Sequence, residues 1–452
     1  MKAQVLASQD LYLHISIGRW ILANHSIPDH GIFSASMPDA PWVAHEWLAS
    51  VGLAFLYDHL GWGGVLAAIA LLLAIAIGVL TLNVAATLGP VGALFAALLA
   101  WGLCINHLVA RPHVAAMPLV VIWIAAHVRA RRADGIPRFY LVPLMTVWAN
   151  LHGSFMFGLG FTLLFAAEAI FESETIDRAL FAALRWSGFL AACILAAVVT
   201  PHGLDGLLFP IQLVNAQGAL DSVLEWQPST TANSAPLFLW CALLLFLALW
   251  QGVRMPVCRL VMLMLLLYMA FAHRRHIELL GLAAPLLLQF TVADVLSRSS
   301  PSIMSQWGPF ARPAVELSLA VVAMFVAGVF GVAGCAHVVR GPDEFTPAAA
   351  LAAVEARGIG GPVLNAQNFG GYFIFRNYPP FIDGRVDMYG DKFMLRYAAL
   401  SELTALLEQY RIAWTIFEPD DPRTVIMDRL PDWTRLHADD IAVVHVRTTL
   451  SH

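Results

Sequence analysis

The chain has 452 residues, of which 59% are hydrophobic and 13% are charged, and its mean hydropathy is +0.70. A soluble globular chain carries about a quarter charged residues, so this composition excludes an ordinary soluble protein. The net charge of −5 includes no basic block, which argues against a nucleic-acid-binding protein. The five cysteines lie in or beside apolar runs without a CxxC spacing. They are interpreted as buried hydrophobic residues rather than redox or metal groups: Cys104, Cys193, Cys241, Cys258 and Cys335.

Ten apolar segments predict an α-helical polytopic membrane protein. Most of them have the roughly 17–25 residues that cross about 30 Å of hydrocarbon. In chain order they are 63–87, 90–108, 114–130, 138–151, 154–171, 181–200, 236–253, 256–272, 277–296 and 314–337. Segment 45–60 is also apolar, but it is short and polar at both ends. We therefore expect it to form a helix that lies in the membrane interface.

The basic residues of the loops predict the orientation. The densest cluster runs from Arg129 to Arg138, and the positive-inside rule places it in the cytoplasm. The other basic residues that then fall on this side are Arg178, Arg185, Arg254, Arg259, Arg298 and Arg312. The first loop and the tail are then extracytoplasmic. The cluster His273-Arg274-Arg275-His276 falls outside against the rule, which indicates either a function for these residues or an error of one span in the count.

The composition changes after Val338 and predicts a small α/β domain. Helices are expected over 346–357 and 400–410, and strands over 363–366, 381–383, 413–417 and 441–446. Helices that alternate with short apolar strands are typical of layered α/β domains. We therefore divide the chain into an extracytoplasmic first loop with interfacial helices (1–62), a helical membrane domain (63–337) and a soluble extracytoplasmic domain (341–452).

Ionisable residues from seven loops or span ends gather at the predicted outer surface. They are Asp10, His14, His45, Glu46, Arg111, His113, His152, His202, Glu225, His273, Arg274, Arg275 and His276. Such groups are costly at a membrane boundary unless they are paired or solvated, which makes them functional candidates. A single histidine at a span end is more often an interface side chain that reaches to water than a catalyst. The joint pattern is more informative than any single residue.

These residue types fit group transfer from a lipid-linked phosphosugar. A carboxylate such as Asp10, Glu46 or Glu225 can take a proton from an acceptor hydroxyl. Arginines clamp phosphate or pyrophosphate, and histidines donate to the same phosphate or hold a metal. A proton-coupled transporter would use the same residue types. However, these residues lie at one rim rather than along a path through the middle of the membrane.

Several motifs resemble the first external loop of bacterial multi-span proteins of the GT-C glycosyltransferase type. They are Asp10-Leu-Tyr-Leu-His14, Gly18-Arg19-Trp20-Ile21-Leu22, Ile27-Pro28-Asp29, Phe33-Ser34 and Pro41-Trp42-Val43-Ala44-His45-Glu46-Trp47-Leu48. Further matches are Arg111-Pro112-His113, Trp148-Ala-Asn150-Leu-His152-Gly153, Thr200-Pro201-His202-Gly203, Glu225-Trp226, His273-Arg274-Arg275-His276, Phe369-Gly-Gly-Tyr372 and Ile382-Asp383-Gly384-Arg385-Val-Asp387. The resemblance covers most of the chain. It is specific to an uncharacterised branch and only architectural for protein mannosyltransferases and lipid A aminoarabinose transferases.

The resemblance implies a polyprenyl-phosphate sugar as donor, an envelope glycan or protein as acceptor, and a site at the outer face of the bacterial inner membrane. Asp10 matches the first-loop acid that activates the acceptor, and His45 and Glu46 lie in the second interfacial helix. Relatives usually carry Asp-Pro-Asp where this chain has Ser8-Gln9-Asp10. They also have a span before this loop. Either that span is encoded upstream of Met1, or the following hairpin pulls the first loop across the membrane.

The leading hypothesis is a GT-C-like glycosyltransferase. Asp10, Glu46 and His45 would be catalytic, and Arg111, Arg274 and Arg275 would bind the donor phosphate. The residues expected to surround these groups, or to hold a divalent metal, are His14, His113, His152, His202, His273, His276 and Glu225. The alternative is a non-catalytic membrane protein whose C-terminal domain binds an envelope glycan or partner through Asp383, Arg385 and Asp387. Those three residues equally fit a turn in which Arg385 is paired locally.

Overall fold

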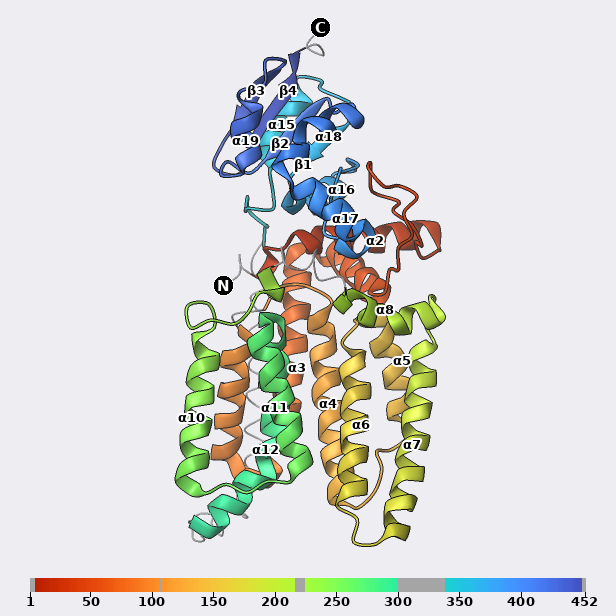
Figure 1. The fold of residues 1–452 in the computed structure, drawn as a ribbon, viewed down its shortest axis with the longest axis vertical. Coiled ribbons are helices and arrows are strands. Elements are labelled where there is room, and N and C mark those ends of the chain that lie inside the picture. Colours follow the sequence, from red (N-terminus) through yellow and green to blue (C-terminus); the bar gives the residue numbers. More distant parts are fainter. Residues whose placement is uncertain (1–4, 106–107, 216–223, 300–337, 449–452) are drawn as a thin grey trace.

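The computed structural model describes residues 5–105, 108–215, 224–299 and 338–448. A bundle of long helices forms one end of the molecule, and a small sheet with its own helices forms the other (Figure 1). Helix α2 (Gln9–Asn24) lies between the two parts. The bundle contains α3 (Trp47–Cys104), α4 (His113–Arg132), α5 (Leu141–Leu151), α6 (Phe155–Phe171), α7 (Ile176–Val198), α10 (Ala235–Gln251), α11 (Val257–Ala272) and α12 (Ile277–Ser299).

The predicted apolar segments up to 277–296 all lie on helices of this bundle. Within the described residues, four helices are long and apolar enough to cross a membrane: Trp47–Cys104, His113–Arg132, Ile176–Val198 and Arg274–Arg298. The bundle also contains shorter apolar helices, α5, α6, α10 and α11. These helices indicate a multi-pass membrane protein. Segment 314–337 and Cys335 lie outside the described residues, so the number of spans stays a prediction.

Two glycines divide the 58 residues of α3 into three helical pieces. Gly61 and Gly89 have φ values of 63° and 68°, in the left-handed region that favours glycine, and Pro90 follows the second of them. The first piece covers most of segment 45–60 and packs against α2. A side-chain carbon at Gly18 of α2 would overlap the backbone carbonyl of Ser50, so the two helices touch backbone to backbone. The interfacial position of this piece stays a prediction.

One buried ionic network lies inside the bundle. Glu168 of α6 is 3% exposed and accepts two hydrogen bonds from Arg259 of α11, at 2.8 and 3.0 Å. Arg131 of α4 lies 3.4 Å from the same carboxylate and 3.0 Å from Glu172. A buried carboxylate is tolerated only when it is paired in this way. The network therefore ties α4, α6 and α11 together.

The C-terminal part carries a four-stranded sheet in the order β1-β2-β4-β3. Strands β1 (Val363–Asn365) and β2 (Trp414–Phe417) are parallel, whereas β4 (Val443–Arg447) runs antiparallel to both β2 and β3 (Trp433–Ala438). The helices of this part are α15 (Ala348–Ala356), α16 (Gly370–Phe375), α17 (Val386–Ala398), α18 (Leu403–Gln409) and α19 (Pro422–Met427). Helices α16 and α17 lie at the end of this part that faces α2 (Figure 1).

The expected strand over 381–383 is wrong, because this segment is irregular. Its backbone is satisfied by a side chain instead of a neighbouring strand. Asn365 accepts from the Phe381 N–H at 2.8 Å and donates to the Ile382 carbonyl at 2.8 Å. The sequence also did not predict β3, whose residues after Trp433 are partly or fully exposed, because an edge strand with polar side chains lacks the apolar signal of a buried one.

Candidate functional site

The candidate residues meet where the helix ends of the bundle face the C-terminal part. α2 carries Asp10 and His14, and His45 and Glu46 directly precede α3. Arg111 precedes α4, and His152 follows α5. Glu225 lies in the short helix η2 (Leu224–Trp226), and Arg274, Arg275 and His276 form the short helix η3 (Arg274–His276). Residues far apart in the sequence therefore become neighbours because successive helices end at the same level.

Three histidines surround the carboxylate of Glu46. Its Oε1 atom lies 3.5 Å from His45 Nε2 and 3.3 Å from His152 Nε2, and its Oε2 atom lies 3.5 Å from His14 Nε2. Hydrogen bonds at the other ring nitrogen, Nδ1, hold two of these imidazole rings in place. His14 Nδ1 bonds the Ser50 hydroxyl at 2.9 Å, and His152 Nδ1 accepts the Ser154 N–H at 3.1 Å. The Glu46 side chain is 18% exposed, so water reaches this cluster only in part.

The pKa values of Glu46 and its three histidines are shifted in different directions. Burial by itself raises the pKa of Glu46, but His45 and the other two histidines hold it well below its usual range. Burial lowers the pKa of His152 to about 3 and also lowers that of His14. Burial acts in the same direction on His45, but Glu46 outweighs it and raises the His45 pKa. At neutral pH the cluster is therefore a Glu46 carboxylate bordered by the neutral rings of His14 and His152, and His45 is the histidine whose protonated form this carboxylate favours.

A second carboxylate, Asp10, is paired with Arg111. Arg111 Nη2 lies 2.9 Å from Asp10 Oδ2, its Nη1 atom donates to Glu225, and its Nε atom donates to the Ser8 hydroxyl at 3.0 Å. Burial raises the pKa of Asp10, although the nearby Arg111 opposes this shift. Asp10 is therefore a stronger base than Glu46, since its carboxylate holds a proton more readily.

The second basic group surrounds Trp226. The Arg275 guanidinium lies 4.6 Å from the centre of the Trp226 ring, and His273 Nδ1 bonds the Trp226 carbonyl at 2.7 Å. The His276 ring packs edge-on against Phe157 at 5.5 Å between centroids. Within the described residues, neither Arg274 nor Arg275 has a carboxylate within ion-pair distance, and the buried Nε atom of Arg274 has no hydrogen-bond partner. These two cations are less compensated than Arg111.

His113 and His202 lie beside the two clusters rather than within them. His113 Nε2 lies 3.5 Å from Glu278 Oε2, and its ring centroid is 6.3 Å from that of His152. The buried Nε2 atom of His202 has no partner within the described residues. The sequence analysis did not single out Glu278. The sequence feature that could have identified Glu278 is its position two residues after His276, just beyond the His273–His276 motif and on the same helical stretch.

The three candidates of the C-terminal part have different environments. Asp383 and Arg385 are buried and bonded to each other at 2.9 and 2.6 Å, which confirms the local pairing. Tyr389 donates to the same aspartate at 3.0 Å. A glycan cannot reach these buried groups directly. Asp387 is partly exposed, and it lies within electrostatic range of His45, although burial raises its pKa.

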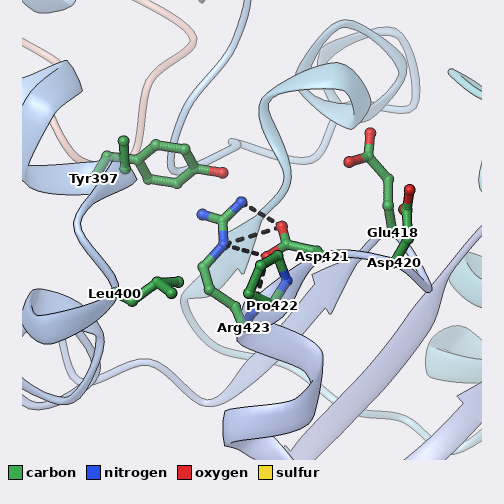
Figure 2. A pocket seen from close by; sticks show the side chains of 8 residues that line it. Tyr397, Leu400, Glu418, Asp420, Asp421, Pro422 and Arg423 are labelled. Atoms are coloured by element: carbon green, nitrogen blue, oxygen red, sulfur yellow. Dashed lines mark hydrogen bonds and ion pairs between the residues drawn. The ribbon is translucent and has the colours of Figure 1, made fainter.

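No group of three or more His, Cys, Asp or Glu side chains within the described ranges is arranged to hold a metal ion. A separate open hollow of about 510 Å³ lies after strand β2 in the C-terminal part (Figure 2). Asp421 in its wall bonds Arg423 at 2.5 Å, and Glu418 accepts from Asn368 at 2.6 Å. Two of its carboxylates are thus already paired.

A bundle of membrane helices, a first loop folded over one end of it and a small α/β part beyond that loop together define the GT-C fold. The comparison with solved structures shows this fold over nearly the whole chain, so the resemblance found in the sequence motifs is confirmed at the level of the fold. By sequence, the chain matches no family model and no curated protein.

Two of the similar structures are of ArnT, the aminoarabinose transferase, from Cupriavidus metallidurans. The apo form has a TM-score of 0.53 at 16% identity and covers 99% of this chain and 95% of its own. The form bound to undecaprenyl phosphate has a TM-score of 0.54 at 15% identity, with coverage of 98% and 94%. The archaeal oligosaccharyltransferase AglB from Archaeoglobus fulgidus, in complex with an inhibitory peptide and a dolichol-phosphate, has a TM-score of 0.54 at 11% identity. This match covers 91% of this chain and 66% of AglB.

Proposed function

We propose that this protein is a GT-C glycosyltransferase that moves a sugar from a polyprenyl-phosphate donor to an envelope acceptor. The observation that carries the proposal is the meeting of Asp10, Glu46, Arg111 and Arg275 at one end of the helical bundle. The similar structures support the lipid-linked donor, because ArnT was solved with undecaprenyl phosphate and AglB with a dolichol-phosphate.

The two cations near Trp226 are the groups proposed to bind the donor phosphate. Arg111 already neutralises Asp10 and Glu225, so a phosphate would have to compete with two carboxylates for it. Among the described residues, Arg274 and Arg275 have no carboxylate within ion-pair distance, although Glu225, Glu46 and Glu278 lie within electrostatic range of Arg275. Guanidinium groups bind phosphate oxygens through paired hydrogen bonds and stabilise the charge that grows on the leaving phosphate.

Asp10 is the proposed base. The acceptor hydroxyl would give its proton to Asp10 as its oxygen attacks the anomeric carbon, and the bond from that carbon to the phosphate oxygen would break. The electron pair of the broken bond leaves with the polyprenyl phosphate. Glu46 is a weak base because its histidines stabilise the ionised form. Its proposed part is to orient the acceptor together with His45.

The proposed location is the bacterial inner membrane, with the site and residues 341–452 on the extracytoplasmic side. This orientation derives from the basic loop Arg129–Arg138, which would lie in the cytoplasm. Cysteine labelling of intact cells tests it. A single cysteine at Ser297 or Asp134 should be protected from a membrane-impermeant reagent, whereas one at Asp420 should react. Labelling of both ends would contradict the proposed orientation.

A transfer assay in membranes tests the function. Full-length protein would be given a radiolabelled polyprenyl-phosphate sugar and envelope extract, and label leaving the lipid fraction would be measured. We expect Asp10→Asn to lower turnover by about 10²- to 10⁴-fold, which is typical of losing a positioned base. Asp29→Asn is the matched control, since Asp29 lies in the same loop but is 85% exposed. Full activity in an Asp10→Asn, Glu46→Gln double variant would overturn the assigned roles.

A further inference from the structure

Helix α2 is shared between two hydrophobic cores. Leu11 and Ile15 are buried in the core of the helical bundle. Tyr12 and Leu13, on other faces of the same helix, are buried in the core of the C-terminal part. Neighbouring residues of a helix point in different directions, so one helix can serve both cores. The helix that carries Asp10 is therefore held from two sides.

The C-terminal part contacts α2 through side-chain hydrogen bonds and through close backbone packing. The Tyr12 hydroxyl lies 3.0 Å from the Thr346 hydroxyl, and Arg340 donates to the Ser8 carbonyl at 3.1 Å. A side-chain carbon at Gly371 of α16 would overlap the backbone carbonyl of Gln9. Such close approach leaves little freedom for α2 to slide relative to the C-terminal part.

Gly384 brings the same part into contact with Asp10 itself. A carbon added at Gly384 would overlap Asp10 Oδ1, and the other atoms near that carbon, Asp10 Cγ and Gln9 Cδ, lie at 3.6 and 3.8 Å. The backbone of Gly384 does not have a positive φ, so space rather than conformation favours glycine here. Because the overlapping atom is the end of the Asp10 side chain, a methyl group at Gly384 would fit only if the carboxylate moved. The second oxygen of Asp10, Oδ2, is held by Arg111.

The loop around Gly384 is itself firmly held. The buried Asp383–Arg385 pair flanks it, and the Arg385 guanidinium lies 4.9 Å from the centre of the Trp42 ring of the first loop. Ser36 of the first loop donates to the Phe381 carbonyl at 2.5 Å. These contacts fix the backbone at Gly384 relative to the loop that ends at Glu46.

We propose that Gly384 is a positioning residue of the transferase site, through which the backbone of the C-terminal domain fixes the orientation of the Asp10 carboxylate. The carboxylate lies between Arg111 at one oxygen and Gly384 at the other. The acceptor then meets a base of fixed orientation. This raises the rate of transfer, because even a small misplacement of the reacting groups lowers that rate by a large factor. This inference rests on the proposed function. It makes the C-terminal domain an obligatory part of the catalytic unit rather than a separate binding module.

A double-mutant cycle on stability tests the contact without any assay of activity. Thermal unfolding of the full-length protein in detergent would be measured for Gly384→Ala, Asp10→Ala and the double variant. We expect Gly384→Ala to lower the Tm by roughly 2 °C or more in the native background, because the added methyl group collides with Asp10. In the Asp10→Ala background the collision partner is gone and the same change should have little effect. Additive shifts would overturn the proposed contact.

Activity and its pH dependence test the positioning role. Gly384→Ala should lower turnover by about 10- to 100-fold. It should also move the acidic limb of the pH profile to lower pH, because the methyl group pushes Asp10 towards Arg111. Gly360→Ala is the control, since Gly360 has open space around it, and it should change neither quantity. Native turnover and an unmoved profile in Gly384→Ala would refute the positioning role. An inactive native protein would instead refute the proposed function, and the stability cycle would still decide the contact.

Discussion

His152 makes the stability of the candidate site depend on pH, and the change His152→Gln tests how. The Nδ1 atom of His152 accepts a hydrogen bond from the Ser154 N–H at 3.1 Å, which a protonated imidazolium cannot do. Its Nε2 atom lies 3.3 Å from the Glu46 carboxylate. The ring is therefore neutral, and burial lowers its pKa from 6.5 to about 3.

The sign and size of the effect follow from this shift. Between pH 6.5 and 3 the unfolded chain binds a proton that the folded protein excludes, so the folded state loses stability as the pH falls. The loss is about 1.4 kcal/mol for each pH unit below 6.5, or about 2 kcal/mol at pH 5. Glu46 has a lowered pKa, and its own contribution is lost only below the usual range of a glutamate. The raised pKa values of Asp10 and His45 give contributions of the opposite sign, but these are shared by the native protein and His152→Gln. The difference between the two proteins from pH 5 to 6.5 therefore reports His152.

Thermal unfolding of purified protein in detergent, measured from pH 5 to 7.5, is the assay. The native protein should lose stability steadily below pH 6.5. His152→Gln should be less stable at pH 7.5 but should show a shallower decline, because one of the excluded protons is gone. His25→Gln, which changes an exposed residue, controls for removal of an imidazole. Equal declines in the native protein and His152→Gln would refute the reasoning.

Three further changes test the packing and the donor site. Glu168→Gln should lower the stability by about 3–5 kcal/mol in thermal unfolding, because its arginine partner stays buried and unpaired. Glu172→Gln, at a side chain that is 40% exposed, should cost about 0–1 kcal/mol. Gly18→Ala should cost about 1–3 kcal/mol by the same measurement because its methyl group meets the backbone of α3. Gly52→Ala, in open space inside the helix, should instead stabilise by about 0.5–1 kcal/mol because alanine favours the helix. Arg275→Lys should raise the KM for the lipid donor about tenfold in the transfer assay, because lysine keeps the charge but loses the planar contact with the indole ring. A native KM in that variant would count against its proposed contact with the phosphate.

The sequence by itself determined the helical bundle and the identity of the polar residues. Apolar runs that are long enough to cross the membrane indicate helices buried in lipid or protein. The structure has helices at all of the predicted segments up to 277–296. The residues of the candidate site were also visible, because histidines, arginines and carboxylates at span ends are rare and costly. The alternatives for Asp383 and Arg385 stayed open until the structure showed their buried pair.

Only the tertiary structure decided which of these groups meet and in what charge state. Pairs such as Arg111 with Asp10, or His152 with Glu46, join residues about a hundred positions apart, and no local pattern encodes such a contact. Burial and neighbouring charges then separate the two acids, so that Asp10 is the stronger base and Glu46 the weaker. The contact of Gly384 with Asp10 is likewise set by packing, since a glycine carries no side chain from which the sequence could reveal its neighbour.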